Sequence, residues 1–381
     1  MAIARRLRDG GLEILSVPDP ARAAVIIPSM GVTDKTCVAV IGLGYWGPNR
    51  LRALSELGDV RVSHICESDA RRLQRFAGRY PDARASTDLA EVLADDEVEA
   101  VVIATPVFTH HLLASRCLEA GKDVFVEKPL AASSGEARGL LELAEKRGRV
   151  LMCGHTFLYS PAVRAVKGLL DRGDLGDLHF ISSSRVNLGP YRSDVSVIFD
   201  LGPHDFSILR YWLDGVPSSV SAVGRDVITE GIADVAFIDL TYPDGLLAHV
   251  ELSWLAPSKL RRTVIVGSEK MLVYEDGSAE PVRLFDSGIE YSDPETYGEY
   301  QLSYRTGEIV SLRVDPKEPI VAELEDFIAS VRTGSKPLSG PDVAIDVIRL
   351  VEAAEASLSD AGLNVPMSPT AASGALAGPG E

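Results

Sequence analysis

The sequence predicts a two-domain protein, in which an N-terminal α/β domain with a doubly wound parallel sheet precedes a C-terminal α/β domain on a large, mostly antiparallel sheet. The chain has 381 residues, more than one ordinary domain needs. Short apolar strands alternate with amphipathic helices between residues 37 and 153, as in a parallel sheet covered on both faces. Longer strands of alternating polarity follow from residue 178, as in an antiparallel sheet with one face exposed or covered by a partner.

The first half of the chain supplies the parallel sheet. Pro48 suits the first turn of the first helix, and Gly121 suits the end of the third. The expected strands are Cys37–Ile41, Val60–Cys66, Glu99–Ala104, Asp123–Val126 and Val150–Cys153, and the expected helices are Asn49–Leu57, Ala70–Arg79, Thr109–Ala120 and Ser134–Arg147. This alternation predicts a domain over residues 36–154.

The second half of the chain supplies the antiparallel sheet. Turn signals lie between several strands, such as the sequence PDG at 243–245. The expected strands are Leu178–Asn187, Val220–Ile228, Asp234–Tyr242, Leu246–Trp254, Thr263–Val266 and Met271–Tyr274, and the expected helices are Ala162–Asp171, Ile320–Arg332 and Pro341–Leu358. These elements predict a substrate-binding and oligomerisation domain over residues 155–362.

Both ends of the chain lack such patterns. Residues 1–35 form a mobile extension, or translation begins naturally at Met30; the intact mass of the native protein distinguishes the two readings. Residues 363–381 are rich in Ala, Ser, Pro and Gly, which is typical of a disordered tail.

Composition narrows the functional classes. The formal net charge of -17 argues against a broad surface for nucleic acid or anionic membrane. No apolar run approaches the roughly 20 residues of a membrane span. The four cysteines are widely spaced and form no CxxC pair, so we expect neither a metal site nor a disulfide framework, and a cytoplasmic location fits.

A glycine turn follows the first strand. Gly42, Gly44 and Gly47 form a G-x-G-x-x-G pattern between a strand and a helix, which is the context of a Rossmann dinucleotide-binding site. Glycines let the backbone approach a pyrophosphate, and the helix N-terminus faces its charge. We therefore expect Tyr45 and Trp46, in the same turn, to contact the cofactor.

Glu67 ends the second strand, about 20 residues after the last glycine, where an acidic side chain binds the ribose of NAD. This favours NAD over NADP. Arg71 and Arg72 follow closely and suit a 2′-phosphate, so NADP stays an alternative. A further alternative is that Glu67 and Asp69 only cap the next helix.

Five motifs in this order resemble the Gfo/Idh/MocA oxidoreductases, a family of sugar, inositol and nucleotide-sugar dehydrogenases. They are GLGYWGPN at 42–49, ATPVFTHH at 104–111, VEKPL at 126–130, GHTFLYSPAV at 154–163 and DLGPHDFSIL at 200–209. The resemblance covers residues 36–362, and its nearest branch is similar to UDP-N-acetylglucosamine 3-dehydrogenases. It implies a homodimer or homotetramer, because relatives pack their exposed sheets together.

The resemblance also implies roles for individual residues. It places Lys128 of VEKPL beside both the nicotinamide and the reacting carbon, and it matches the family's Asp-x-x-x-His pair to Asp200 and His204. Pro129 is often cis in relatives. The residues that the resemblance places beside the cofactor are Thr105, Pro106, His110 and Glu127.

Oxidation of a secondary alcohol needs a base for the hydroxyl proton, and histidine suits neutral pH. Asp200 and His204 are four residues apart, so a helix places both on one face, and Pro203 suits its first turn. We expect His204 to be the base, Asp200 to orient it, and Lys128 to stabilise the alkoxide. Lys128 as the proton carrier is the competing assignment, and His204 as a core or capping histidine is the structural alternative.

Polar residues near the predicted cleft are candidates for substrate binding. These are His155, Arg185, Asn187, Tyr191, Arg192 and Trp254. His155 is equally compatible with a packed structural role, Arg192 with the surface and Trp254 with the core. The basic sequence KLRR at 259–262 suits a nucleotide diphosphate or a subunit edge. Ser160 stands where relatives commonly have asparagine, which leaves the substrate open.

These features favour an NAD-dependent dehydrogenase acting on a sugar ring carbon, above all C3 of a nucleotide-linked sugar. The alternatives are an NADPH-dependent keto-sugar reductase of deoxysugar biosynthesis, an inositol-type dehydrogenase and a cofactor-sensing regulator without catalysis. A small-molecule substrate is expected in each enzymatic case, with no nucleic-acid or membrane partner.

Overall fold

The computed structural model describes residues 3–6, 12–15, 35–291 and 302–368. Met1–Lys35 forms a unit of its own, in which β1 (Ile3–Arg6) pairs antiparallel with β2 (Leu12–Leu15). Most of the predicted mobile extension lies outside the described residues. The second unit is Thr36–Glu381.

The N-terminal domain holds a six-stranded parallel sheet of order β5-β4-β3-β6-β7-β8, as the alternating pattern predicts. Its strands are β3 (Thr36–Ile41), β4 (Val60–Cys66), β5 (Arg84–Ser86), β6 (Ala100–Ile103), β7 (Asp123–Glu127) and β8 (Leu151–Gly154). Its helices are α1 (Gly47–Glu56), α2 (Ala70–Ala77), α3 (Leu89–Ala94), α4 (His110–Glu119) and α5 (Ser134–Arg147). The strand order reverses between β3 and β6, and ligands of such sheets bind at the carboxyl ends there.

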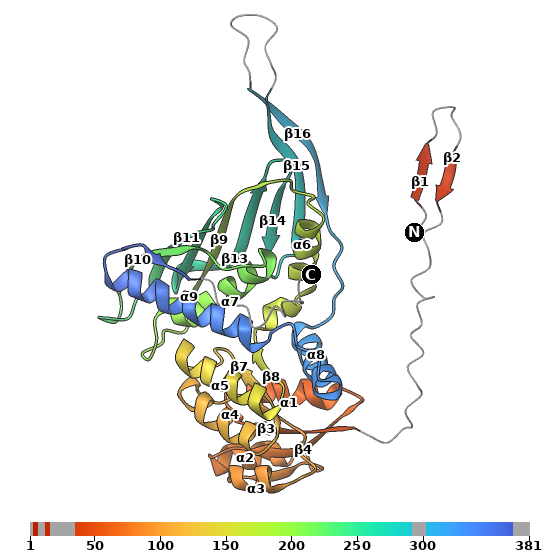
Figure 1. Ribbon diagram of the computed structural model, residues 1–381, viewed down its shortest axis with the longest axis vertical. Coiled ribbons are helices and arrows are strands. Elements are labelled where there is room, and N and C mark those ends of the chain that lie inside the picture. Colours follow the sequence, from red (N-terminus) through yellow and green to blue (C-terminus); the bar gives the residue numbers. More distant parts are fainter. Residues whose placement is uncertain (1–2, 7–11, 16–34, 292–301, 369–381) are drawn as a thin grey trace, which may run out of the picture. The chain divides into compact units, whose positions relative to one another are not determined.

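The C-terminal domain holds a nine-stranded sheet of order β16-β15-β14-β13-β9-β12-β11-β10-β17, in which only the β9–β12 pairing is parallel. Its strands are β9 (Leu178–Leu188), β10 (Ser219–Arg225), β11 (Val235–Thr241), β12 (Leu247–Ser253), β13 (Leu255–Gly267), β14 (Met271–Glu275), β15 (Val282–Tyr291), β16 (Leu302–Ser311) and β17 (Val365–Pro366). Figure 1 shows α7 (Val197–Trp212) and α9 (Pro341–Ser359) between this sheet and the N-terminal domain.

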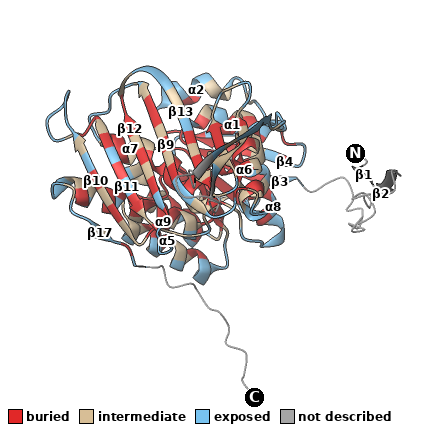
Figure 2. Ribbon diagram, turned by 90° about the horizontal axis from the view of Figure 1, so that it is seen from above, coloured by how far each residue is buried: buried red, intermediate tan, exposed pale blue. Residues whose placement is uncertain are grey.

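Among the described residues, one face of the large sheet keeps exposed and half-buried side chains. Along β10, β11 and β12 buried residues alternate with exposed or half-buried ones, which Figure 2 shows as bands of red, tan and blue. The outward residues include the exposed apolar side chains of Phe180, Val223, Phe237 and Leu247. This alternation is the one that predicts an antiparallel sheet with a free or partner-covered face.

Helix α8 (Pro319–Thr333) belongs to the range predicted for the C-terminal domain, yet it packs on the N-terminal one. Leu324 and Phe327 join a core cluster with Val38 and Val40 of β3, and Figure 1 shows α8 beside α1. The chain therefore returns to the parallel sheet near its end.

Helix α6 (Pro161–Asp171) begins one residue before its predicted start.

Several local predictions need correction. Strand β13 begins at Leu255 and not at Thr263; its first half is mostly polar and lacks apolar alternation, so the sequence pattern does not mark it as a strand. Pro203 lies inside α7 and not in its first turn, because Ser196 caps the helix by accepting hydrogen bonds from two backbone N–H groups. Within the predicted tail, Val365 and Pro366 form β17, which pairs antiparallel with β10, and residues 369–381 lie outside the described residues. In the described part of the chain no helix is long and apolar enough to cross a membrane.

Candidate active site

The glycine turn has the shape that a dinucleotide requires. Gly42 has a φ of 91°, and a Cβ atom on it would lie 2.7 Å from the backbone oxygen of Ala104. A Cβ atom on Gly47 would lie 2.0 Å from the backbone oxygen of Gly42, so both positions exclude larger residues. Nothing lies within 4 Å of the Cβ position of Gly44, which leaves that side accessible to a ligand. These residues fit the pyrophosphate of NAD.

Glu67 lies buried beside this turn at the end of β4. Its carboxylate accepts hydrogen bonds from the backbone N–H of Leu43 at 2.7 Å and of Asp69 at 3.0 Å, and Arg72 lies 3.3 Å away. Burial raises the pKa of Glu67, but these three groups outweigh it and the net pKa is lowered. The side chain of Asp69 caps α2 by accepting hydrogen bonds from the backbone N–H groups of Arg71 and Arg72, and ribose binding by Glu67 stays a prediction.

The loop after β6 is tied to the segment after β7. The ring of His110 is buried, and its nitrogens lie 2.8 Å from the backbone oxygens of Thr105 and Pro129. The Lys128–Pro129 peptide bond is cis, as the resemblance implies. His110 therefore supports the loop that carries Thr105 and Pro106, and it does not itself line the cavity.

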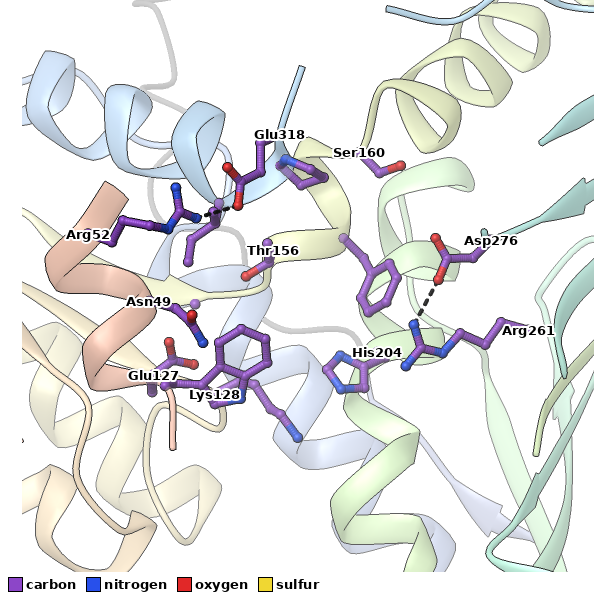
Figure 3. Close-up of a pocket in the computed structure, with 15 residues that line it drawn as sticks. Asn49, Arg52, Glu127, Lys128, Thr156, Ser160, His204, Arg261, Asp276 and Glu318 are labelled. Carbon is purple, nitrogen blue, oxygen red and sulfur yellow. Dashed lines mark hydrogen bonds and ion pairs between the residues drawn. The ribbon is translucent and has the colours of Figure 1, made fainter. Parts of the chain in front are cut away.

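A cavity of about 380 Å³ lies beside the glycine turn and between the two domains (Figure 3). The N-terminal domain and the start of α8, which packs on it, contribute Trp46, Asn49, Arg52, Glu127, Lys128, Gly154, Glu318, Pro319 and Ile320. The C-terminal domain contributes Thr156, Phe157, Ser160, His204, Arg261 and Asp276. Arg52 is paired with Glu318 at 2.5 Å, and Arg261 with Asp276 at 2.8 Å.

Lys128 lines this cavity and contacts Asp200, which lies behind the cavity lining. The Nζ atom of Lys128 donates a hydrogen bond of 2.9 Å to the backbone oxygen of Asp200 and lies 3.8 Å from its Oδ1 atom. Oδ2 of Asp200 accepts a hydrogen bond of 3.3 Å from the indole of Trp254, and Arg192 lies 3.6 Å from Oδ1. Burial lowers the pKa of Lys128, although the charges of Asp200 and Glu127 oppose this.

His204 lies one helical turn after Asp200 and points into the same part of the cavity as Lys128 (Figure 3). Its ring meets that of Phe157 edge-on at 5.1 Å. Burial lowers the pKa of His204 well below its usual range, and the charges of Lys128, Arg185 and Arg261 lower it further. Within the described residues no hydrogen bond joins His204 to the Asp200 carboxylate, which contacts Lys128, Trp254 and Arg192 instead.

The predicted substrate residues differ in burial, and none of them is among the residues that line the cavity. Tyr191 and Arg192 are partly exposed beside Trp254 and Asp200. Arg185 and Trp254 are buried supports: Arg185 pairs with Asp205 and stacks on Phe157, and Trp254 bonds Asp200. Asn187 is half-buried on β9 and does not line the cavity.

His155 differs from all of these. It is 2% exposed, and neither ring nitrogen has a hydrogen-bond partner among the described residues. Burial and the charge of Lys128 lower the pKa of His155 to about 3, so the ring is neutral. Its neighbours Gly154 and Thr156 line the cavity, which places it at the edge of the site.

The sequence does not single out several residues of the wall. Asn49 and Arg52 follow the glycine turn on α1, so a helical wheel of this helix could have identified them. Thr156 and Phe157 lie within the motif at 154–163, which could have identified them. Asp276, Glu318 and Ile320 come from distant segments and carry no local pattern. In the described residues no group of three or more His, Cys, Asp or Glu side chains is placed to hold a metal ion.

Comparison with known proteins places the chain among oxidoreductases. Residues 36–155 match a family model described as oxidoreductase family, NAD-binding Rossmann fold, and residues 163–273 match the GFO/IDH/MocA C-terminal domain. Inositol 2-dehydrogenase 2 of Saccharopolyspora erythraea is 32% identical over 224 residues, 56% of this chain and 66% of that protein. Inositol 2-dehydrogenase of Rhizobium meliloti is 25% identical over 332 residues, 84% of this chain and 96% of that protein.

A solved structure extends the likeness to the whole fold. GenD2 from gentamicin A biosynthesis, in complex with NAD, superposes with a TM-score of 0.74 at 26% identity, over 89% of this chain and 98% of that one. The two matched family models together cover more than half of this chain. The chain therefore belongs to the Gfo/Idh/MocA family of oxidoreductases, and its N-terminal domain is an NAD-binding Rossmann domain.

Proposed function

We propose that this protein is an NAD-dependent dehydrogenase that acts on a ring hydroxyl of a sugar or cyclitol. The observation that carries the proposal is the cavity in which Lys128 and His204 lie beside the glycine turn, at the carboxyl ends of the parallel strands. Such a site serves alcohol oxidation and ketone reduction alike, so the direction follows from the substrates that the cell supplies.

We assign the proton transfer to Lys128 and the orientation of the substrate hydroxyl to His204. A general base works best when its pKa lies near the working pH. Burial and then three nearby cations make protonation of His204 unfavourable, and no carboxylate hydrogen bond stabilises its imidazolium within the described residues. Lys128 has a lowered pKa and faces the Asp200 carboxylate, which stabilises the ammonium form once the proton has arrived.

The reaction then divides between cofactor and protein. Bound NAD supplies the hydride acceptor for the alcohol carbon. The neutral Nζ atom of Lys128 takes the hydroxyl proton, and the ammonium group returns that proton in the reductive direction. His204 holds the oxygen through a ring nitrogen, and the surrounding walls exclude water from the reacting carbon.

The charges of the cavity wall support an uncharged substrate. Arg52 is paired with Glu318 and Arg261 with Asp276, and both members of each pair line the cavity. A phosphate or carboxylate would face the anionic partner of each cation, whereas vicinal hydroxyls can bond both members of a pair. We therefore place a cyclitol or free sugar ahead of the C3 position of a nucleotide-linked sugar. The latter is the second candidate, because Arg261 of the KLRR segment does reach the cavity.

Steady-state kinetics test the proposal. The protein is mixed with NAD or NADP and with inositols, free sugars, sugar acids and nucleotide sugars, and reduced cofactor is followed by absorbance. We expect Lys128→Met to lower kcat by about 1,000-fold and His204→Gln by about 100-fold, since each removes a group that handles the reacting proton or oxygen.

Lys122→Met is the matched control. Lys122 is a buried lysine just before β7, and its Nζ atom donates to the backbone oxygen of Asp95, away from the cavity. It should keep the wild-type kcat. Near wild-type kcat in both site variants would overturn the mechanism, and NAD binding without turnover of any alcohol would favour a cofactor-sensing regulator. The homo-oligomer, NADPH-dependent reduction and the cytoplasmic location stay predictions.

A further inference from the structure

A cluster of buried charges lies behind the cavity wall. Arg50 of α1 is 1% exposed, and its Nε atom lies 2.5 Å from Oε1 of Glu127. Its Nη1 atom forms an ion pair with Oε2 of Glu323 on α8. Both carboxylates are buried, Glu323 completely. One guanidinium therefore joins two carboxylates from segments far apart in the sequence.

Every nitrogen of this guanidinium has a partner. The Nη2 atom donates to the hydroxyl of Thr156 at 3.1 Å, and that hydroxyl donates to Glu323 at 2.8 Å. The guanidinium carbon also lies 4.6 Å from the centre of the Phe125 ring on β7. Arg50 thus connects α1, β7, the short helix η3 (Thr156–Tyr159) and α8 in one network.

Two members of the network border the reaction space. Glu127 and Thr156 line the cavity, and Lys128 follows Glu127 directly in the chain. The backbone of Glu127 is paired with Gly154 at the end of the sheet, and its side chain is anchored on Arg50. The position of Lys128 therefore depends on how firmly Glu127 is held.

Stability alone does not account for this arrangement. Taking ions out of water is costly, and a buried ion pair is often no more stabilising than apolar residues of similar volume. The second carboxylate oxygen of Glu323 has no hydrogen-bond partner among the described residues, so the network is not even complete. Its geometry, in contrast, is specific, because the guanidinium fork fixes direction as well as distance.

We propose that Arg50 is a positioning residue for the proton-transfer step, which holds Lys128 in place through Glu127, and that Glu323 fixes Arg50 in turn. This inference rests on the proposed function of Lys128. A displacement of about 1 Å at a reacting group can cost about 100-fold in rate. We therefore expect Arg50→Met to lower kcat by roughly 10- to 100-fold, and Glu323→Gln by less, while KM for the alcohol changes by less than about threefold.

The pH profile separates positioning from a general loss of packing. The charged and titratable groups that face Lys128 are Glu127 on its own segment, His155 after β8, Arg185 on β9, Arg192 before α7, and Asp200 and His204 on α7. Removing Arg50 frees the charge of Glu127 to act on Lys128. The limb of the kcat profile that reports Lys128 should then move to higher pH in Arg50→Met.

Arg332→Met is the matched control. Arg332 also ties α8 to the parallel sheet, through Thr36 and Asp59, but at the opposite end of the helix. It should lower the melting temperature while leaving kcat and its pH profile unchanged. Should Arg50→Met fail to fold, the same measurements are made on Glu323→Gln and on the double variant Arg50→Met/Glu323→Met, which replaces the ion pair by apolar side chains.

Crystal structures of the variants give a readout that does not need turnover. In Arg50→Met, or in the double variant, the hydrogen bond from Lys128 Nζ to the Asp200 backbone should be lost. If the wild-type protein oxidises no alcohol, the proposed function fails, and this distance alone then tests the positioning role. The inference is overturned if the folded variants keep the wild-type position of Lys128, or keep kcat and its pH profile, or if Arg332→Met lowers kcat equally.

Discussion

The Nζ atom of Lys128 donates a hydrogen bond of 2.9 Å to the backbone oxygen of Asp200, and it lies 3.8 Å from the carboxylate of the same residue. This contact joins the residue that follows β7 to the first turn of α7. Burial lowers the pKa of Lys128, and the Asp200 charge opposes that effect. Asp200 therefore influences both the position and the protonation of Lys128.

The first prediction concerns this charge. Asp200→Asn keeps the backbone acceptor and removes the carboxylate, so the pKa of Lys128 should fall further. The limb of the kcat/KM profile that reports Lys128 should move to lower pH by roughly one unit, the usual scale for loss of an opposite charge at this distance. Kinetics across pH for wild type and variant measure the shift. Asp194→Asn, which removes an exposed partner of Arg192, is the control. An unchanged limb in Asp200→Asn, or a shift to higher pH, argues against this coupling.

The second prediction concerns cofactor preference. Glu67 presents a buried carboxylate beside the glycine turn, with Arg72 at 3.3 Å. Glu67→Ser removes the charge that repels a 2′-phosphate and frees Arg72 to bind one. The ratio of kcat/KM with NADP to that with NAD should rise by about tenfold or more. Asp69→Ser serves as the control, since serine keeps the helix cap while one nearby charge is lost. A ratio that rises equally in both variants would assign the preference to general charge and not to Glu67.

Local patterns account for the parts of the site that could be predicted from the sequence. The strand, the glycine turn and the start of α1 lie within a dozen residues, so their periodicity and the demands of Gly42 and Gly47 are visible in one window. Lys128 and His204 likewise lie in short continuous motifs, VEKPL at 126–130 and DLGPHDFSIL at 200–209. The four-residue spacing predicts that Asp200 lies near His204. The direction of the Asp200 carboxylate depends on its contacts with Lys128 and Trp254, which this spacing cannot predict.

Contacts between distant segments account for the parts that could not be predicted. Arg50 and Glu323 are 273 positions apart and meet only because α8 packs on the parallel sheet. Glu318 reaches the cavity at the start of the same helix, and Asp276 reaches it from the end of β14. From sequence alone, an isolated charged residue is expected to be exposed to solvent. No nearby sequence pattern indicates that these residues are buried or line the cavity. Long-range packing decides their role.

The third prediction concerns the buried carboxyl group of Glu323. Burial raises its pKa from 4.5 to about 7, with the charge of Arg50 opposing and that of Glu127 reinforcing the rise. The native state therefore holds a proton that the unfolded state releases, and stability falls as pH rises from about 4.5 to about 7. Glu323→Gln lacks this titration. As pH rises across that window, the free energy of unfolding of Glu323→Gln minus that of wild type should increase by at most about 3 kcal/mol. Above the window this difference should stay constant.

Urea unfolding at a series of pH values measures this difference. Glu325→Gln, at an exposed position of the same helix, is the control and should follow the wild-type curve. A difference between Glu323→Gln and wild type that stays constant from pH 5 to pH 8 would show that Glu323 does not titrate in this range. If the free energy of unfolding of Glu323→Gln minus that of wild type instead increases toward low pH, the pKa of Glu323 is not raised.

The fourth prediction concerns the end of the described chain, where the composition suggests a disordered tail. Met367 is 8% exposed, belongs to the core under the large sheet, and donates its backbone N–H to Ser218 at 2.7 Å. Met367→Ala should lower the free energy of unfolding by about 2 kcal/mol, as truncation of a buried methionine does. Leu363→Ala, at a position 62% exposed, should change it by less than about 0.5 kcal/mol. Equal, negligible effects in urea unfolding would place the whole segment outside the folded core, whereas a loss confined to Met367→Ala makes β17 part of the C-terminal sheet.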